Sequence, residues 1–467
     1  MPFGFVRESM RRGARSERVT IEGAATMTPP ARFDFVRNAM PMSTKRWLLL
    51  GVLVGACLIP FASRPESSSG SDVGLAFESC IEIEFDVRRP CDLAPFSPSI
   101  DSKLVFSPDG RSAYTSSSPV LMEYSRSRSG ALEYERCSAF NASEVVPSCS
   151  ELGRNVLGRG DMVVSPDGDR VYQTTLRGTV ATYLRRSDGS LSLAGCSAAR
   201  GVAGCATVPR EVGPVAEIEV SRDGRHVYVS SIENGVAVYR QPERGALKFQ
   251  SCVSTTGRAC GRIRHGKADF GGELLMTPNG RTLFRLSSYA ISVFSRDAKG
   301  NLKPKGCLGS GWIQVKGCRR SPVGRTIWDE MVMGPWGNRL HVMARGIRAL
   351  VTFRISRDGS LGFERCLSNQ GRRGCESAGK LLNAPISFLR DPAGTGVYVN
   401  VAGDTLERYA WGKGGRLRYR GCLSTATYRD CAQESFLGRI WLNAISPDGQ
   451  DLYFNDEGGW WVFGKTD

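Results

Sequence analysis

Histidine is scarce in this sequence, and the histidines present show no spacing typical of a catalytic or metal site. The chain of 467 residues has three histidines, no Cys-x-x-Cys spacing and no His-Glu-x-x-His sequence. It also lacks a Gly-x-Ser-x-Gly elbow and a Walker loop. These absences exclude the common signatures of zinc proteases, serine hydrolases and P-loop nucleotide hydrolases. We expect His226 and His341 to lie at equivalent strand positions and His265 to lie in a loop. We expect all three to be structural or surface residues.

Helical spacing of apolar residues is absent too, and a different pattern recurs in its place. A turn of the type Ser-Pro-Asp-Gly returns about every 56 residues, and a third strand, Gly-x-Leu and a cysteine follow each one. A four-stranded sheet repeated at such a period is typical of a propeller blade, because one sheet cannot bury both faces without neighbours. We therefore predict an all-β fold, a seven-bladed β-propeller. The turns begin at Ser107, Ser165, Ser221, Thr277, Gly334, Asp391 and Ser446.

The two ends of the repeat region predict how the ring closes. The last repeat ends at 460–463, one strand short of a full blade. The missing fourth strand matches the sequence at 74–80, which is similar to 245–252 and 359–366. We predict that this N-terminal strand completes the C-terminal blade and removes the exposed sheet edges. The alternative is an open arc of blades with a disordered N-terminal strand.

The cysteines fall into pairs at one place in the repeat. Each pair brackets the loop from the fourth strand of one blade to the first strand of the next. Such an even set predicts a disulfide framework, which persists outside a reducing cytosol. A zinc site would need cysteines from different blades. The pairs are Cys80/Cys91, Cys137/Cys149, Cys196/Cys205, Cys252/Cys260, Cys307/Cys318, Cys366/Cys375 and Cys422/Cys431.

The remaining cysteine, Cys57, lies in a segment with the composition of an export signal. A basic pair at 45–46 precedes the uncharged apolar run 47–56, and 54–57 fits a small-residue cleavage site or, loosely, a lipobox. Lipidation of Cys57, ordinary signal cleavage and retention as an anchor stay open, although the run is short for spanning a membrane. We expect a secreted or cell-envelope protein. Its segments are a basic, disordered or untranslated part at 1–39, the signal at 40–63, a linker at 64–73 and the propeller at 74–467.

The chain is basic, with a formal net charge of +16, which raises the question of a polyanionic partner. Many basic residues lie in the hairpins between third and fourth strands, all on one rim of the ring. Acidic residues interleave with them, so we favour solvated hairpin tips over a basic face for an anionic polymer or phospholipid, and we expect no nucleic-acid partner. The basic residues are Arg126, Arg128, Arg185, Arg186, Arg240, Arg244, Arg296, Lys299, Arg354, Arg357, Lys413 and Arg416.

Carboxylates recur four residues before the turns of consecutive blades, where the innermost strands begin. Like charges at one height near the axis raise one another's pKa or bind a cation. We therefore predict a ligand site formed by Lys103, Asp161, Glu217, Glu273 and Glu330, with Ca²⁺ or another divalent cation at the four carboxylates. The alternative is that each carboxylate pairs locally with an arginine or a backbone amide of a neighbouring blade. The seven positions are Lys103, Asp161, Glu217, Glu273, Glu330, Ser387 and Leu442, with Glu219 and Asp329 beside them.

The stretch Ser221–Tyr239, with its Asp-Gly turn followed by Val-Tyr-Val and Val-x-Val-Tyr, carries a family resemblance. It resembles the lactonase-like propellers, which include bacterial phosphogluconolactonase and the surface-layer Tyr-Val-Thr-Asn repeat proteins. The Cys-Leu-Ser sequence at 366–368 with Gly374 and Cys375 is similar to a secreted, disulfide-rich bacterial branch. The resemblance covers 74–463 and implies the fold. The catalytic arginine, glutamate and histidine of the lactonases do not map onto this chain.

Two functions follow from these patterns. We favour an exported binding or scaffold propeller, a monomer that recognises an envelope protein or a glycan and meets the membrane only through its N-terminal lipid or signal anchor. The alternative is a lactonase-like hydrolase or isomerase, in which a carboxylate of the ring is the general base or a metal ligand. The sequence assigns no catalytic residue.

Overall fold

The computed structural model describes the propeller region of the chain. The described residues all lie within the compact unit Glu66–Asp467. They are 74–82, 92–93, 102–117, 119–142, 146–152, 156–158, 160–199, 201–232, 235–263, 272–378, 382, 385–401, 405–425, 431–433, 441–455 and 459–466. The predictions for 1–73, including the signal and Cys57, lie outside this part.

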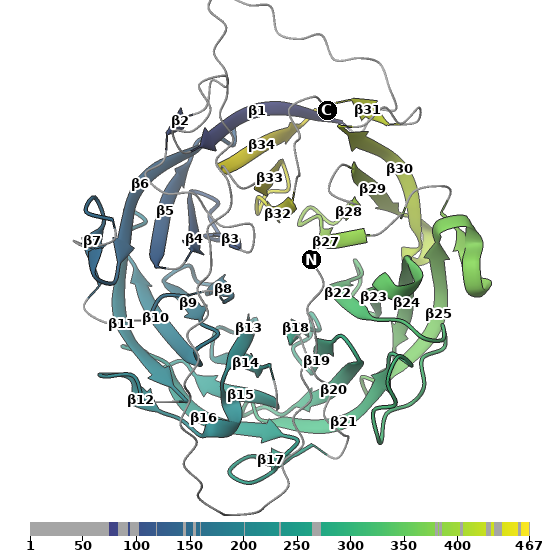
Figure 1. The fold of residues 1–467 in the computed structure, drawn as a ribbon, viewed down its shortest axis with the longest axis horizontal. Helices are drawn as coiled ribbons and strands as arrows, with labels where there is room; N and C mark the ends of the chain where they lie inside the picture. Colours follow the sequence, from purple (N-terminus) through teal and green to yellow (C-terminus); the bar gives the residue numbers. More distant parts are fainter. Residues whose placement is uncertain are drawn as a thin grey trace, which may run out of the picture. The chain divides into compact units, whose positions relative to one another are not determined.

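Seven antiparallel sheets surround a common axis, each with one strand nearest the axis and the others in order outward (Figure 1). The innermost strands are β3 (Leu104–Phe106), β8 (Met162–Val164), β13 (Val215–Val220), β18 (Glu273–Met276), β22 (Trp328–Met333), β27 (Pro385–Arg390) and β32 (Trp441–Ile445). The second strands are β4 (Ser112–Ser117), β9 (Arg170–Thr174), β14 (His226–Ser231), β19 (Thr282–Ser287), β23 (Arg339–Ala344), β28 (Gly396–Val401) and β33 (Asp451–Asn455). The third strands are β5 (Val120–Arg126), β10 (Thr179–Arg185), β15 (Gly235–Arg240), β20 (Ala290–Arg296), β24 (Ala349–Ile355), β29 (Thr405–Trp411) and β34 (Gly459–Lys465).

The fourth strands form the outside of the ring, and the first of them in the chain closes it. They are β6 (Leu132–Ala139), β11 (Leu191–Ala198), β16 (Lys248–Ser254), β21 (Leu302–Gly309), β25 (Leu361–Ser368), β30 (Leu417–Ser424) and β1 (Leu75–Glu82). Strand β1 pairs antiparallel with β34, from Leu75 opposite Lys465 to Glu82 opposite Gly459. The predicted seven-bladed propeller and its closure by the N-terminal strand are therefore confirmed. Short 3₁₀ turns lie in the loops: η1 (Arg210–Val212), η2 (Arg345–Ile347), η3 (Asn369–Gly374) and η4 (Lys413–Gly415).

The recurring turn folds by local hydrogen bonds. In the first blade the Ser107 and Ser112 backbones pair at 2.9 Å, and the Gly110 amide donates to the Ser107 carbonyl at 2.8 Å. The Asp109 carboxylate accepts from the Arg111 amide at 3.1 Å. Gly110 has a φ of +67°, a conformation that glycine adopts without the steric cost of a side chain. The same Ser-x-Asp-Gly spacing therefore reproduces the same tight corner from blade to blade.

A short fifth strand, which the sequence reading missed, lies on the outer edge of most blades. In six sheets the residues just after the second cysteine of a pair add two residues in parallel to the fourth strand. They are β2 (Asp92–Leu93), β7 (Ser150–Glu151), β12 (Ala206–Thr207), β17 (Gly261–Arg262), β26 (Glu376–Ser377) and β31 (Ala432–Gln433). The blade of β18–β21 has only a single parallel bridge there, between Leu308 and Arg319. These additions cover edges that would otherwise present unpaired backbone groups.

Six of the seven predicted disulfides are formed between described residues, and each lies beside such an edge. They are Cys137–Cys149, Cys196–Cys205, Cys252–Cys260, Cys307–Cys318, Cys366–Cys375 and Cys422–Cys431. The predicted pair Cys80/Cys91 includes Cys91, which lies outside the described residues. In each of the six, the first cysteine is on the fourth strand and the second immediately precedes the fifth strand or bridge. The cross-links thus hold the interblade loops against the outside of the ring.

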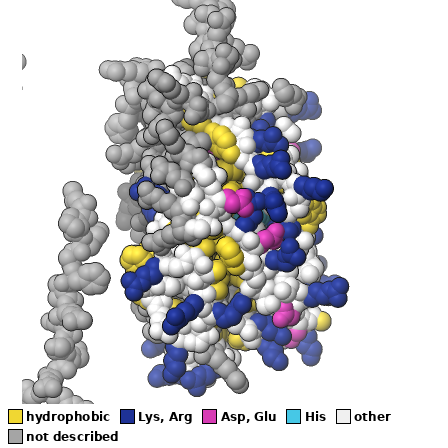
Figure 2. All heavy atoms as spheres, turned by 90° about the vertical axis from the view of Figure 1, so that its right-hand side faces the viewer, with side chains coloured by type: hydrophobic (Ala, Val, Ile, Leu, Met, Phe, Trp, Pro, Cys, Tyr) yellow, Lys and Arg dark blue, Asp and Glu magenta, His cyan; other side chains and the backbone are white. Residues whose placement is uncertain are grey.

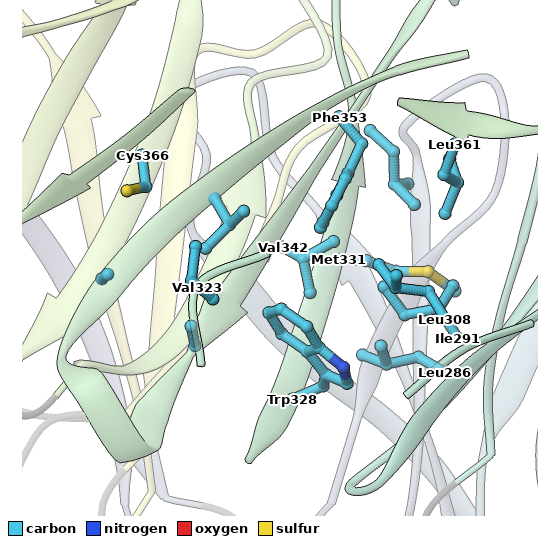
Figure 3. Close-up of a cluster of buried hydrophobic side chains, with 14 of the residues drawn as sticks. Leu286, Ile291, Leu308, Val323, Trp328, Met331, Val342, Phe353, Leu361 and Cys366 are labelled. Atoms are coloured by element: carbon cyan, nitrogen blue, oxygen red, sulfur yellow. The ribbon is translucent and has the colours of Figure 1, made fainter. Parts of the chain in front are cut away.

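The core lies between neighbouring blades. Between the blades of β18–β21 and β22–β26, Trp328 and Met331 pack with Leu286, Ile291 and other buried apolar side chains (Figure 3). Trp328 is 1% exposed although it begins an innermost strand. Its indole therefore belongs both to the interblade core and to the wall of the central opening described below.

A recurring pair of side chains joins each blade to the next on the rim that carries the turns. One partner is the aromatic position of a second strand, and the other is the end of the third strand in the following blade. The pairs are Tyr114 with Arg185, Tyr172 with Gln241, Tyr228 with Arg296, Phe284 with Ile355, His341 with Trp411, Tyr398 with Lys465 and Tyr453 with Arg126. We call them the junction pairs. Where the second-strand residue is Phe284, the equivalent third-strand residue is the aliphatic Ile355, and both belong to one hydrophobic cluster.

In three junction pairs an arginine also reaches the neighbouring turn. Arg296 donates through Nε to the Tyr228 hydroxyl at 2.6 Å and through Nη2 to Asp223 at 3.1 Å. Arg126, Arg185 and Arg296 are only 9–12% exposed. The interpretation of these three as solvated hairpin tips is therefore wrong, because their guanidinium groups are held between blades. Arg354, by contrast, is 67% exposed.

His341 occupies the position that a tyrosine such as Tyr228 holds in other blades. The expected equivalence with His226 is therefore wrong, because His226 lies two residues earlier in its own repeat. His341 pairs with Thr352 on the neighbouring third strand, and Tyr228 pairs with the corresponding residue of its own blade, Val238. The imidazole contacts the Trp411 ring at a centroid distance of 4.9 Å, and burial lowers its pKa to about 3. His341 is therefore a neutral packing residue, as expected. His226 is buried beside Arg296, and His265 lies outside the described residues.

Basic side chains dominate one flank of the ring. Lys and Arg are spread over the side that carries β25 and β30 in Figure 1, and Asp and Glu are sparse there (Figure 2). The outer strand β30 alone exposes Arg418 and Arg420. The positive charge of the chain therefore lies partly on the outer strands and not only at the hairpin rim.

Candidate functional site

The starts of the innermost strands surround a cavity of about 460 Å³. All seven positions predicted from the spacing line it, so the structure brings the predicted residues together at one height. Their role as ligand or metal contacts stays a prediction. The wall consists of Lys103, Gly160, Asp161, Glu217, Gly272, Glu273, Leu286, Ser287, Ser288, Trp328, Asp329, Glu330, Ile386, Ser387, Phe388, Leu389, Leu442 and Asn443.

Several polar side chains on or beside this wall each accept a hydrogen bond from the backbone of the next innermost strand. Asp161 accepts from the Ile218 amide at 3.1 Å, and Glu273 accepts from the Met331 amide at 2.9 Å. The same contact joins Glu330 to the Phe388 amide, Glu219 to the Met276 amide and Asn443 to the Leu104 amide. The sequence left open that each carboxylate pairs with a backbone amide of a neighbouring blade. This pairing is present at one oxygen of Asp161, Glu219, Glu273 and Glu330. Glu217 forms a side-chain hydrogen bond with Asp161 of the preceding blade.

Lys103 provides the positive charge of the cavity. Its Nζ lies 2.8 Å from Asp161 Oδ1, and the Asp161 side chain is only 4% exposed. Burial alone would lower the pKa of Lys103, but the charges of Asp161 and Glu217 outweigh it and raise that pKa. Lys103 is therefore protonated at neutral pH, and its charge balances one carboxylate of the group.

The other carboxyl groups hold protons more tightly than free glutamate does. Burial, together with the charge of Asp161, raises the pKa of Glu217 well above its usual range, and burial with the charge of Glu330 does the same for Glu273. Burial and the charge of Asp329 raise the pKa of Glu330 to about 8. At neutral pH the wall therefore presents neutral carboxyl groups, which can donate hydrogen bonds, as well as carboxylates, which accept them.

Two further wall residues, which sequence reasoning did not select as functional, carry buried polar atoms without a partner. Trp328 Nε1 and Ser387 Oγ have no hydrogen-bond partner within the described structure. Their residues are 1% and 8% exposed. A buried donor without a partner costs about 1–3 kcal/mol, so such groups are uncommon away from sites that a ligand or water completes. Ser387 could have been selected as a site residue, because it is one of the seven positions four residues before the turns. The spacing gave no indication of Trp328.

The carboxyl groups are not arranged as a ready metal centre. Within the described ranges, no group of three or more His, Cys, Asp or Glu side chains is close enough to hold a metal ion. The ammonium group of Lys103 occupies the cation's place next to Asp161. The prediction of Ca²⁺ at Asp161, Glu217, Glu273 and Glu330 thus gains no support from this geometry and stays a prediction.

Comparisons with known proteins give structural similarities only. No protein-family profile and no curated protein matches the sequence. Among solved structures, a Lactobacillus plantarum protein has a TM-score of 0.49 at 17% identity, with 72% of this chain and 85% of that chain covered. The periplasmic gluconolactonase PpgL of Pseudomonas aeruginosa has a TM-score of 0.46 at 20% identity, with 69% and 85% covered. The hydrazine synthase of Kuenenia stuttgartiensis has a TM-score of 0.46 at 13% identity, with 82% and 100% covered. At these values the similarities assign no activity and no ligand.

In the part of the chain that the structure describes, no helix has the length and apolar character needed to cross a membrane.

Proposed function

We propose that this protein is an exported binding propeller whose central cavity holds a small polyhydroxylated molecule, of the class of sugars and sugar lactones. The observation that carries the proposal is the pair of unpartnered buried groups, Trp328 Nε1 and Ser387 Oγ, on the wall of a cavity that also carries carboxyl groups. Export is supported by the disulfides, which persist in oxidising compartments.

The chemistry of the wall favours hydroxyl groups. An indole N–H can only donate, so Trp328 requires an acceptor, whereas the carboxyl oxygens on the wall can accept a hydrogen bond. A hydroxyl group supplies both, and several hydroxyls on one ring can bridge the two kinds of wall group. The cavity volume of about 460 Å³ lies in the range of small-molecule sites, roughly 300–1,000 Å³. Apolar wall residues, among them Leu286 and Phe388, suit the carbon face of such a ring.

Calorimetric titration of the purified, oxidised protein with a panel of monosaccharides, disaccharides and aldonolactones tests this proposal. We expect one ligand class to bind with one site per chain. Ser387→Ala and Glu217→Gln should each weaken binding about tenfold, because each removes a hydrogen bond in a buried site. Glu243→Gln, at an exposed hairpin residue, is the matched control and should bind as the unmodified protein does. Equal affinities for all four proteins, or no binding of any sugar or lactone, would contradict the cavity as the site.

A second candidate function is the opening of a lactone in the same cavity. It is favoured by the raised pKa of Glu330, about 8, which keeps a proton donor at neutral pH on the same cavity wall as the protonated amine of Lys103. A carboxyl group of this kind can act as a general acid, and an ammonium group can stabilise negative charge that develops on oxygen. A pH-stat assay with the lactone that binds best distinguishes the two functions. Acid release abolished by Glu330→Gln would support the hydrolase, whereas binding without acid release would support the binding propeller.

A further inference from the structure

The loop between β21 and β22 is long and cross-linked. It runs from Ser310 to Ile327 and leads directly into Trp328 on the cavity wall. The disulfide Cys307–Cys318 ties its first half to β21. Parallel bridges pair Leu308 with Arg319 and Gly311 with Thr326. The Thr326 amide donates to the Ser310 carbonyl at 3.0 Å, so the two ends of the loop are held together.

This loop forms a hollow of its own, distinct from the central cavity. Its volume is about 430 Å³, and every lining residue comes from the loop or its junction with β21. Trp312 and Ile313, two adjacent residues of this lining, are 52% and 40% exposed. Large apolar side chains exposed side by side in a hollow, on a backbone fixed by a disulfide, indicate a contact surface. A rigid surface also loses little conformational entropy on binding.

The charge around the hollow has one sign. Arg319, Arg320 and Arg325 line it, and Lys316 lies in the same loop. The sequence from Gly309 to Thr326 contains no aspartate or glutamate. Arg319 donates to the Leu361 carbonyl at 2.6 Å, which fixes its guanidinium position. Guanidinium groups bind carboxylates in a planar, two-point manner, so the hollow fits a ligand with carboxylate groups.

We propose that this hollow is a second binding site, for an acidic polysaccharide of the uronate class. The exposed Trp312 indole offers a flat face for the C–H side of a sugar ring, and Arg319 and Arg320 lie where ring carboxylates can pair with them. An acidic peptide fits less well, because the loop backbone at 308–311 already pairs with 319–326 and does not offer a strand edge. The proposal is independent of the central cavity, since it uses none of the residues assigned there.

Titration of the full-length protein with an oligogalacturonate trimer, followed by calorimetry, tests the proposal. We expect binding that weakens about tenfold in Trp312→Ala and in Arg320→Ala, as expected for loss of one charge-assisted or stacking contact. Trp336→Ala and Arg225→Ala are matched controls, because both residues are exposed on turns of the opposite rim and Trp336 is 60% exposed. Both controls should bind as the unmodified protein does. Ser387→Ala, in the central cavity, should also leave this binding unchanged.

Three further probes separate the ligand classes. Maltotriose, a neutral trimer of similar size, should bind at least about tenfold more weakly than the uronate if the arginines select the carboxylates. Hexaglutamate peptide and vesicles of anionic phospholipid should show no saturable binding that depends on Trp312. Tighter binding of either probe than of the uronate, with the same dependence on Trp312, would overturn the polysaccharide assignment. Equal uronate binding by Trp312→Ala, Arg320→Ala and the controls would overturn the site, and melting curves of all variants confirm that each is folded.

Discussion

Arg126 Nε donates a hydrogen bond of 2.8 Å to the Tyr453 hydroxyl and thereby joins the first blade to the last. The Nη2 atom of the same guanidinium group lies 3.0 Å from Asp448 and also contacts Asp451. The Tyr453 hydroxyl in turn donates to the Gly130 carbonyl at 2.7 Å. Ring closure therefore rests on this junction pair as well as on the backbone pairing of β1 with β34.

Loss of the Arg126 guanidinium should destabilise the whole ring. Arg126→Ala leaves the Asp451 carboxyl, 6% exposed, without the guanidinium group that pairs with it. Breaking a buried ion pair from one side costs about 3–5 kcal/mol, and we expect a loss near the lower end because Asp448 is half exposed. Denaturant unfolding gives the free energy directly. Arg128→Ala, at the exposed tip of the same hairpin, is the control and should change the stability by less than about 0.5 kcal/mol. Equal stabilities of the two variants would show that the guanidinium contributes nothing to closure.

The junction pairs should be exchangeable as units. Tyr228→Phe with Arg296→Ile places at one junction the residue types that stand at the equivalent positions Phe284 and Ile355. Each single change removes the same hydrogen bond, from Arg296 Nε to the Tyr228 hydroxyl, so the double variant should lose less stability than the sum of the two singles, by about 1 kcal/mol or more. A double-mutant cycle by denaturant unfolding measures this coupling. The parallel cycle of Tyr228→Phe with Arg225→Ile, an exposed turn residue, should be additive; a coupling of the same size there would contradict a specific pair.

The stability of the protein should fall as the pH rises from about 5 to 8. In the folded protein Glu330 has a pKa of about 8, above its value of 4.5 in an unfolded chain, because burial and the charge of Asp329 disfavour ionisation. Between these two values the folded state binds more protons than the unfolded state, so deprotonation favours unfolding. Each such group contributes a slope of at most about 1.4 kcal/mol per pH unit. Below the lower value the stabilising difference is fully present.

Glu330→Gln tests this dependence. The amide keeps an acceptor for the Phe388 backbone but cannot ionise, so the variant should lose less stability than the unmodified protein between pH 5 and 8. Some dependence should remain, because burial also raises the pKa of Glu219 to about 7. Unfolding midpoints across this range provide the measurement, and Glu243→Gln at the exposed hairpin should follow the unmodified curve. A Glu330→Gln curve parallel to the unmodified one would mean that this carboxyl does not hold its proton on folding.

Removal of one disulfide should loosen one outer edge and leave the ring intact. Cys422→Ser with Cys431→Ser opens the loop before β31, and the chain-entropy model gives a loss of somewhat under about 3 kcal/mol for a loop of this length. Amide hydrogen exchange should accelerate at Ala432 and Gln433, which pair with Leu423 and Ser424. Exchange in the equivalent strand of another blade, at Glu376 and Ser377, serves as the internal control and should not change. Unchanged exchange at β31 would show that its pairing does not need the cross-link.

Features formed by residues that are close together in the chain could be predicted from the sequence. The turn at Ser107–Gly110 closes by contacts within six residues, so its spacing alone predicts it. The pairs of cysteines are close in sequence as well as in space. The positions from Lys103 to Leu442 could be placed on one wall because each is counted from its own turn.

Features shared between two blades were harder to see. Arg126 and Tyr453 are 327 residues apart, and an arginine at a hairpin looks the same whether water or a neighbouring blade surrounds it. A signal was nevertheless present in the sequence. In the blade where Phe284 stands in place of the tyrosine, Ile355 stands in place of the arginine in the next blade. In the blade where His341 stands in place of the tyrosine, Trp411 stands in place of the arginine. The burial of Trp328 Nε1 without a partner could not be inferred, because it depends on how the neighbouring blades pack around the indole.

Strands β1 and β34 pair although they lie at opposite ends of the propeller sequence, and this affects the order of assembly. During synthesis β1 emerges first, yet its partner strand, up to Lys465, emerges last. Until then the inner edge of β1 has to stay without its partner strand while the other blades form. Such long-range pairing is slow because the loop must close before the contact forms. The last blade is thus a checkpoint for the whole chain: a truncated product cannot complete it, and only a fully synthesised chain becomes a closed ring.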